Sequence, residues 1–181
     1  AEMTDRDAFW ATQIIARFTP EQIRAAVESA EFSNPEDTDY VTLQLVRRQH
    51  KIVEAYANRR AGIGNFELSK TQNDYVLAFA DYRNFVRLED VEGAKNNGKY
   101  VYELKAVGKK GALISRGKLD EQRLRIAPEL IRQIHESNFE EIPEMQSVAE
   151  LRLSRPNEKQ VAAIYLYAEN PASLRVVGIV Y

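Results

Sequence analysis

The chain has 181 residues, of which 44% are apolar and 29% are charged, and its formal net charge is −2 at pH 7. This length suits one domain, or one domain with a smaller helical addition, and is long enough to bury a sizeable core. Cysteine is absent, which excludes disulfides, thiolate metal sites and a cysteine nucleophile. The charge balance gives no support to bulk attraction of nucleic acid or anionic lipid, and no apolar run approaches the ~20 residues of a membrane span.

The first part of the chain, residues 1–62, is predicted to be a helical segment of about three helices. "TDRD" at 4–7 and "TPEQ" at 19–22 have the residue types and the spacing of capping boxes, which mark helix starts. "SNPED" at 33–37 combines a cap residue, a proline and two acids, and predicts a third helix that runs to about Arg60. The glycines that follow should end it.

The third helix carries both an apolar stripe and a group of basic residues. On a helical wheel Val41, Leu45, Ile52 and Tyr56 fall within about 60°, and Val46 and Val53 widen this apolar stripe to about 140°, which predicts that this side faces the core. The basic residues of 47–60 follow acids in the first turns, and the helix dipole favours this order. We therefore interpret the basic residues as a solvated face rather than a polyanion-binding surface, and protein docking is the remaining alternative.

Residues 63–181 are predicted to form a mainly antiparallel β domain with one short inserted helix near 128–137. The connections between the last three strands are short and have turn compositions, which favours hairpins. "VAAIYLYA" at 161–168 is apolar on both faces and is expected inside its sheet, "NFVRL" at 84–88 is a further strand candidate, and "AGIGNF" at 61–66 is interpreted as a helix stop and a loop. The fold class is therefore α+β, with a sandwich as first choice and a single curved sheet covered by the helices as second.

We find no motif that indicates catalysis or metal binding. His50 and His135 are the only histidines, and they lie on different predicted helices. His50 has an acid one turn later, which is half of a helical metal site at best. We predict no catalytic residue, no metal ligand and no cofactor. A carboxylate-based hydrolase remains an alternative that uses two of the scattered acids, among them Asp74, Asp81 and Glu89.

Tyrosines at alternate strand positions are the candidate ligand-binding residues. Tyr100 and Tyr102 in "KYVYEL" form one pair, and Tyr165 and Tyr167 in "IYLYA" form another. Tyrosine rows on a sheet can stack against sugar rings or anchor a protein partner. The alternative is that these side chains fill a sandwich core with their hydroxyl groups at its rim.

The helical stretch "DAFWATQIIARFTPEQIRAAVESAEFSNPEDTDYVTLQLVRRQHKI" at 7–52 resembles a segment near the C-terminal end of long, uncharacterised bacterial proteins. In that group a similar "FW…EQIRA…RR…KI" pattern precedes a strand-rich tail, and "RVVGIVY" at 175–181 resembles the closing strand of that tail. No activity or ligand is attached to the pattern. The resemblance implies that the chain is the terminal region of a larger polypeptide.

These observations predict a non-catalytic accessory or interaction module. Its expected partner is a preceding domain of the same polypeptide or another protein, and nucleic acid is not expected. The first alternative is a carbohydrate- or peptide-binding β-sandwich, and the second is the carboxylate-based hydrolase. An exposed apolar patch on the helices would favour the interaction module, whereas an exposed tyrosine row would favour the sandwich.

Overall fold

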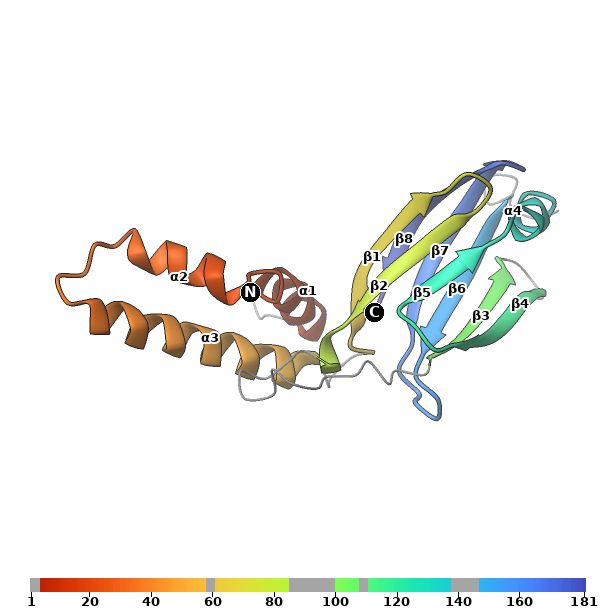
Figure 1. Cartoon of the computed structure of the whole chain (residues 1–181). Coiled ribbons are helices and arrows are strands. Elements are labelled where there is room, and N and C mark those ends of the chain that lie inside the picture. Colours follow the sequence, from red (N-terminus) through yellow and green to blue (C-terminus); the bar gives the residue numbers. More distant parts are fainter. Residues whose placement is uncertain (1–3, 58–60, 85–99, 108–110, 138–146) are drawn as a thin grey trace. The chain divides into compact units, whose positions relative to one another are not determined.

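The computed structural model describes residues 4–57, 61–84, 100–107, 111–137 and 147–181 (Figure 1). Three helices come first and two mainly antiparallel sheets follow, so the predicted α+β class is confirmed. The helices in these ranges are α1 (Asp5–Ile15), α2 (Pro20–Glu28), α3 (Pro35–Ala57), the short 3-10 helix η1 (Tyr82–Asn84) and α4 (Pro128–His135). The strands are β1 (Ile63–Lys70), β2 (Tyr75–Asp81), β3 (Tyr100–Ala106), β4 (Leu113–Leu119), β5 (Arg123–Ile126), β6 (Val148–Ser154), β7 (Ala162–Asn170) and β8 (Ser173–Val180).

The described residues divide into two compact units. Residues 4–57, 61–62 and 81–84 form a helical unit, and residues 63–80 with those from 100 onward form a β unit. The helical unit thus takes in η1, which the sequence boundary at residue 62 had assigned to the β part. None of the described helices has the length and apolar character needed to cross a membrane.

Capping boxes start α1 and α2, as the sequence predicts. The Thr4 hydroxyl accepts a hydrogen bond from the Asp7 backbone N–H at 3.2 Å, and the Asp7 carboxylate accepts one from the Thr4 N–H at 3.1 Å. Thr19 and Gln22 make the same reciprocal pair at 3.2 and 3.0 Å. These bonds satisfy N–H groups that the first turn of a helix leaves without a backbone partner.

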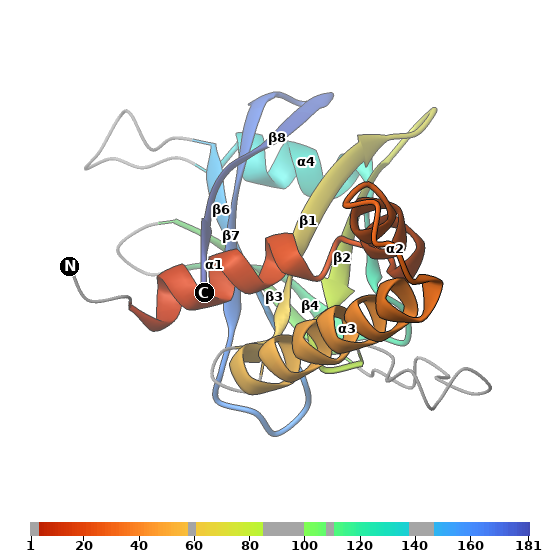
Figure 2. The ribbon, with the colours of Figure 1, turned by 90° about the vertical axis from the view of Figure 1, so that its left-hand side faces the viewer.

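The core-facing side of α3 lies toward one edge of the predicted stripe. Val46 and Val53 of that stripe are buried together with Gln49 and Ala57, whereas Leu45 is 40% exposed. The side-chain amide of Gln49 accounts for the difference, because it donates hydrogen bonds to the carbonyls of Ile15, the last residue of α1, and of Phe18 just after it, at 2.7 and 2.8 Å. Figure 2 shows α1 and α2 lying along α3 in this unit.

The core of the helical unit is completed by η1. Phe9 of α1 is fully buried and packs edge to face against Tyr82, with the ring centroids 6.1 Å apart. The Tyr82 N–H donates to the Gly62 carbonyl at 2.8 Å, and the Arg83 side chain donates to the Ala57 carbonyl at 3.3 Å. The segment after β2 therefore closes the C-terminal end of α3.

The β unit contains two packed sheets, with strand orders β1-β2-β5 and β4-β3-β6-β7-β8. Aromatic side chains join the sheets: Phe79 of β2 meets Tyr100 of β3 edge to face at 4.9 Å, and Phe66 of β1 stacks on Tyr181 at 6.3 Å. This sandwich-like arrangement agrees with the first choice from the sequence. Strand β7 lies between β6 and β8, inside its sheet as predicted.

Three sequence predictions concern short segments of the β part. The loop predicted at 61–66 is wrong, because β1 begins at Ile63 and continues through Phe66. Helix α4 spans Pro128–His135, within the predicted 128–137, and packs on β7 with Ile131 and Ile134 buried. Residues 85–88 of the strand predicted at 84–88 lie outside the described residues.

Candidate functional site

Strand β7 sends its side chains alternately to the two faces of the five-stranded sheet. Ile164 and Leu166 are buried, while Tyr165 and Tyr167 between them are half-buried. Because successive strand residues point to opposite faces, the two tyrosines lie together on the outer face. The sequence therefore identified a tyrosine pair that shares one surface.

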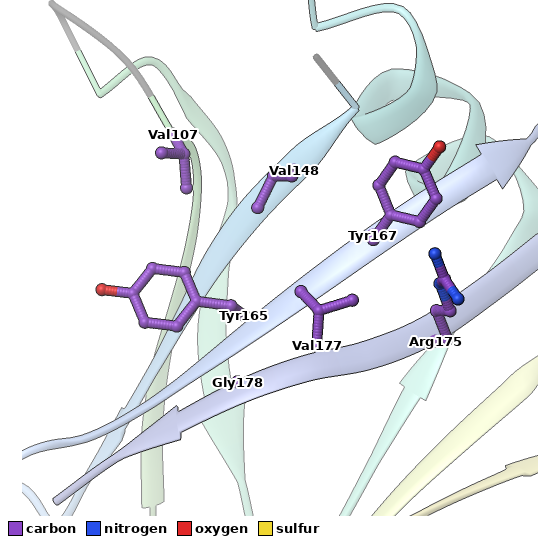
Figure 3. Close-up of a pocket in the computed structure, with 7 residues that line it drawn as sticks. All are labelled: Val107, Val148, Tyr165, Tyr167, Arg175, Val177 and Gly178. Atoms are coloured by element: carbon purple, nitrogen blue, oxygen red, sulfur yellow. The ribbon is translucent and has the colours of Figure 1, made fainter. Parts of the chain in front are cut away.

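These two tyrosines line a pocket of about 600 Å³ (Figure 3). That size falls within the usual range for small-molecule sites, roughly 300–1,000 Å³. Tyr165 projects toward Val107, whereas Tyr167 lies beside Arg175. The pocket spans β6, β7, β8 and the end of β3, and its lining residues are Val107, Val148, Tyr165, Tyr167, Arg175, Val177 and Gly178.

Arg175 gives the pocket a positive charge. It lies opposite Tyr167 in the β7–β8 pair, and its guanidinium carbon is 4.9 Å from the centre of that ring. Stacking of this kind leaves the N–H groups at the guanidinium edge free to donate hydrogen bonds. Within the described part of the chain, no carboxylate pairs with Arg175, and the Tyr165 and Tyr167 hydroxyls have no hydrogen-bond partner.

Four charged side chains on this face of the sheet form two ion pairs. Lys105 is 2.7 Å from Glu103, and Arg152 is 3.1 Å from Glu150. The hydrogen bond and the charge of Lys105 lower the pKa of Glu103, which keeps this carboxylate ionised at neutral pH. The pocket therefore adjoins a band of ion pairs, and Arg175 is the charged residue in its lining.

The other candidate tyrosine pair does not form an exposed row. Tyr100 is 1% exposed and packs on Phe79 between the sheets, so it belongs to the core, as the alternative interpretation of these tyrosines has it. Tyr102 is half-buried, and its hydroxyl lies 3.2 Å from Ser115 Oγ. Its ring occupies the space opposite Gly117, where an added Cβ would come within 2.8 Å of the ring.

Asp74 and Asp81 of the hydrolase alternative do not line the described pocket. Asp74 pairs with Arg125 at 2.6 Å, and Asp81 is buried and accepts a hydrogen bond from the Arg83 N–H at 3.0 Å. Glu89 lies outside the described residues. No group of three potential metal ligands occurs among the residues that the structure describes.

One serine and one histidine lie close together, but their geometry is structural. Ser147 Oγ donates to the His135 carbonyl at 3.0 Å and is 3.5 Å from His135 Nδ1. That nitrogen is 3.1 Å from the Ala168 carbonyl, an arrangement that requires a proton on Nδ1. Nδ1 then has no lone pair to accept the serine proton, so this pair lacks the base that activates a serine nucleophile.

The helical unit presents a second candidate surface. Trp10 and Ile14 lie one turn apart on α1 and are both exposed, and the exposed Phe18 follows the end of the helix. Trp10 is 64% exposed. We call Trp10, Ile14 and Phe18 the α1 apolar surface. Further large apolar residues exposed on this unit are Phe32, Tyr40, Leu43 and Leu45.

The sequence analysis missed most of the pocket. An unbroken register counted from the Asn170–Ser173 pair would place Val176 opposite Tyr167, but the ladder shifts by one residue and places Arg175 there. A second shift, between Tyr165 and Leu166, restores the original register. The composition of the β7–β8 turn indicates a hairpin, yet it carries no signal for these two irregularities.

Comparison with known proteins gives no relative: no family model matches the chain, and neither do any of the curated proteins or solved structures compared with it. Functional interpretation therefore rests on the two surfaces described above.

Proposed function

We propose that the chain is a non-catalytic interaction module that binds a polypeptide through the α1 apolar surface. The observation that supports this proposal is the exposure of Trp10 and Ile14 on α1 and of Phe18 shortly after its end. Large apolar side chains clustered at the surface commonly mark protein interaction sites, and tryptophan is the residue type most enriched among interface hot spots.

The distribution of exposed apolar residues favours the helices over the β unit. Among the described residues, the helical unit exposes seven large apolar side chains, and the larger β unit exposes three, Leu113, Val177 and Val180. Charged residues on the helices are arranged differently: Arg24 pairs with both Glu28 and Asp39 at 2.8 Å. The α1 apolar surface is thus distinct from the ion-paired surface of α2 and α3.

The expected partner is a preceding domain of the same polypeptide or another protein. Its contact surface should be apolar at the centre and polar at the rim, as in specific interfaces.

Site-specific photo-crosslinking in the native host tests this proposal. A benzophenone amino acid in place of Trp10 should crosslink one reproducible polypeptide, identified by mass spectrometry. The same amino acid in place of Arg47 is the matched control, because Arg47 is exposed on α3. The double change Ile14→Ser with Phe18→Ser should abolish the crosslink while the helical circular dichroism is kept. Equal crosslinking from positions 10 and 47 would contradict the proposal.

A carbohydrate- or peptide-binding sandwich is the second candidate. The pocket that contains Tyr165 and Tyr167 supports it, whereas the burial of Tyr100 removes the other tyrosine pair. Binding there would use the β unit alone and is compatible with an interaction role for the helices.

A further inference from the structure

We propose that the pocket on the outer face of the five-stranded sheet binds a small organic carboxylate with an apolar or aromatic body. This inference narrows the ligand class of the second candidate function and, like that candidate, depends on the pocket being a binding site. It is independent of the α1 apolar surface, because every lining residue belongs to the β unit.

The charge of the pocket argues for an anion. Arg175 is the charged residue of the lining, and within the described part of the chain it has no acidic partner. Stacking on Tyr167 fixes one face of the guanidinium at 4.9 Å from the ring, which leaves the planar edge to donate two parallel hydrogen bonds. A carboxylate matches that edge with its two oxygens.

The other residues that line the pocket indicate that the rest of the ligand is apolar. Val107, Val148 and Val177 supply aliphatic surface, and Tyr165 supplies an aromatic ring. Gly178 lies opposite Tyr165 and leaves the side of its ring open, since an added Cβ would sit 3.5 Å from Cδ2. A purely polar ligand would desolvate these walls without gaining hydrogen bonds from them. The two tyrosine hydroxyls can bond a polar group near the body.

The positions of the lining residues indicate the shape of the expected ligand. Figure 3 shows Arg175 and Tyr167 on one side of the pocket, Tyr165 and Val107 on another, and Val177 between them. A carboxylate at Arg175 would therefore direct its apolar body over Val177 toward Tyr165. A phenyl ring joined to a carboxylate by two methylene groups has this general form.

Titration of the intact chain with 3-phenylpropanoate, followed by ¹⁵N and ¹³C NMR, tests the proposal. Chemical shifts should change at Tyr165, Tyr167, Arg175 and Val177 as a group, with a dissociation constant on the order of 1 mM for so small a probe. The alcohol 3-phenylpropan-1-ol keeps the ring but lacks the charge, and we expect it to bind at least tenfold more weakly.

Two variants separate this site from adventitious binding. Arg175→Gln should weaken 3-phenylpropanoate binding about tenfold or more, while Arg123→Gln is the matched control, because Arg123 is exposed on β5 in the other sheet. In a further titration, the affinities of N-acetylglycylphenylalanine and of its C-terminal amide are compared with that of 3-phenylpropanoate. Tighter binding of the peptide acid would show that the carboxylate belongs to a chain end, and tighter binding of 3-phenylpropanoate would indicate a free small acid.

The proposal is overturned if the alcohol binds as tightly as the acid, if Arg175→Gln leaves the affinity unchanged, or if the shifts lie elsewhere. Failure of this test leaves the crosslinking test of the α1 apolar surface unaffected. A sugar-binding pocket would instead respond to neutral oligosaccharides with shifts at the same tyrosines, which would keep the second candidate function and refute the carboxylate ligand.

Discussion

At the scale of single residues, Gln49 shows how one polar side chain can determine helix packing. Its amide occupies a buried position on α3 and satisfies two carbonyls at the end of α1. The Ile15 carbonyl ends α1 and also accepts a hydrogen bond from the Phe18 N–H at 3.3 Å, while the Phe18 carbonyl lies just after the helix. The contact joins residues 31 and 34 positions apart, so no local pattern in the sequence could predict it, and the apolar stripe alone placed the core-facing side too far toward Leu45.

Gln49→Met should therefore destabilise the helical unit by about 1–3 kcal/mol, because it keeps the side-chain volume but removes two partly buried hydrogen bonds to backbone carbonyls. Urea unfolding followed by circular dichroism at 222 nm measures the loss. Gln44→Met is the control: Gln44 is half-buried on the same helix and makes no hydrogen bond within the described residues, so its replacement should change the free energy of unfolding little.

A second prediction for a single residue concerns the stability of the helical unit at low pH. Hydrogen bonds from the hydroxyl and the N–H of Thr4 hold the pKa of Asp7 below its ordinary value of 3.8. Because the folded pKa is the lower one, the ionised carboxylate stabilises the fold above pH 3.8, and this contribution is lost as the pH falls through the lowered pKa. The pH dependence of helix content between pH 5 and pH 2 should accordingly be weaker in Asp7→Asn; identical acid transitions in both proteins would refute it.

At the scale of elements, the sequence predicted correctly those features that depend on residues close together in the chain. The two capping boxes and the interior position of β7 were predicted from neighbouring residues, and the structure contains them. Strand β1 was missed because Gly64 and Asn65, whose φ is +49°, interrupt its alternation. The pocket was only half predicted, since the one-residue shifts in the β7–β8 ladder decide that Arg175 meets Tyr167.

Two tyrosine–glycine pairs across neighbouring strands give a matched test of packing. An added Cβ at Gly117 would lie 2.8 Å from the Tyr102 ring, whereas one at Gly178 would lie 3.5 Å from the Tyr165 ring, an ordinary contact. Tyr102 cannot move without lengthening its 3.2 Å contact with Ser115. Gly117→Ala should therefore cost about 1–2 kcal/mol, and Gly178→Ala should be neutral or slightly stabilising. Thermal unfolding of the two variants measures the difference, and equal effects would contradict this account.

At the scale of the whole molecule, the boundary between the units does not follow the boundary in sequence. The helical unit needs Tyr82, which the chain supplies only after it has formed β1 and β2. A period change in hydrophobic residues marks where strands begin, but it cannot show that the chain later returns to the helices. Composition correctly indicated the α+β class, while the return of η1 depends on contacts distant in sequence.

Tyr82→Ala should lower the stability of the helical unit by about 3 kcal/mol, because it removes a buried ring from against Phe9 and leaves a cavity. Tyr40→Ala is the control in the same unit, since Tyr40 is 65% exposed. A fragment that ends at residue 62 lacks the Tyr82 ring entirely and should show reduced ellipticity at 222 nm. A fully helical and cooperatively unfolding fragment would show that η1 is dispensable.

The order of strands in the larger sheet has a consequence for storage and handling. Its outermost strands, β4 and β8, each have one neighbour in the sheet and carry the exposed apolar residues Leu113 and Val180, a combination that invites strands of other molecules to join. Basic residues on the same strands, Arg116, Lys118 and Arg175, make two copies repel each other. Salt weakens that repulsion, as the Debye length shrinks from about 10 Å at 0.1 M to about 3 Å at 1 M. Concentrated solutions should therefore turn turbid sooner in molar salt than in dilute buffer.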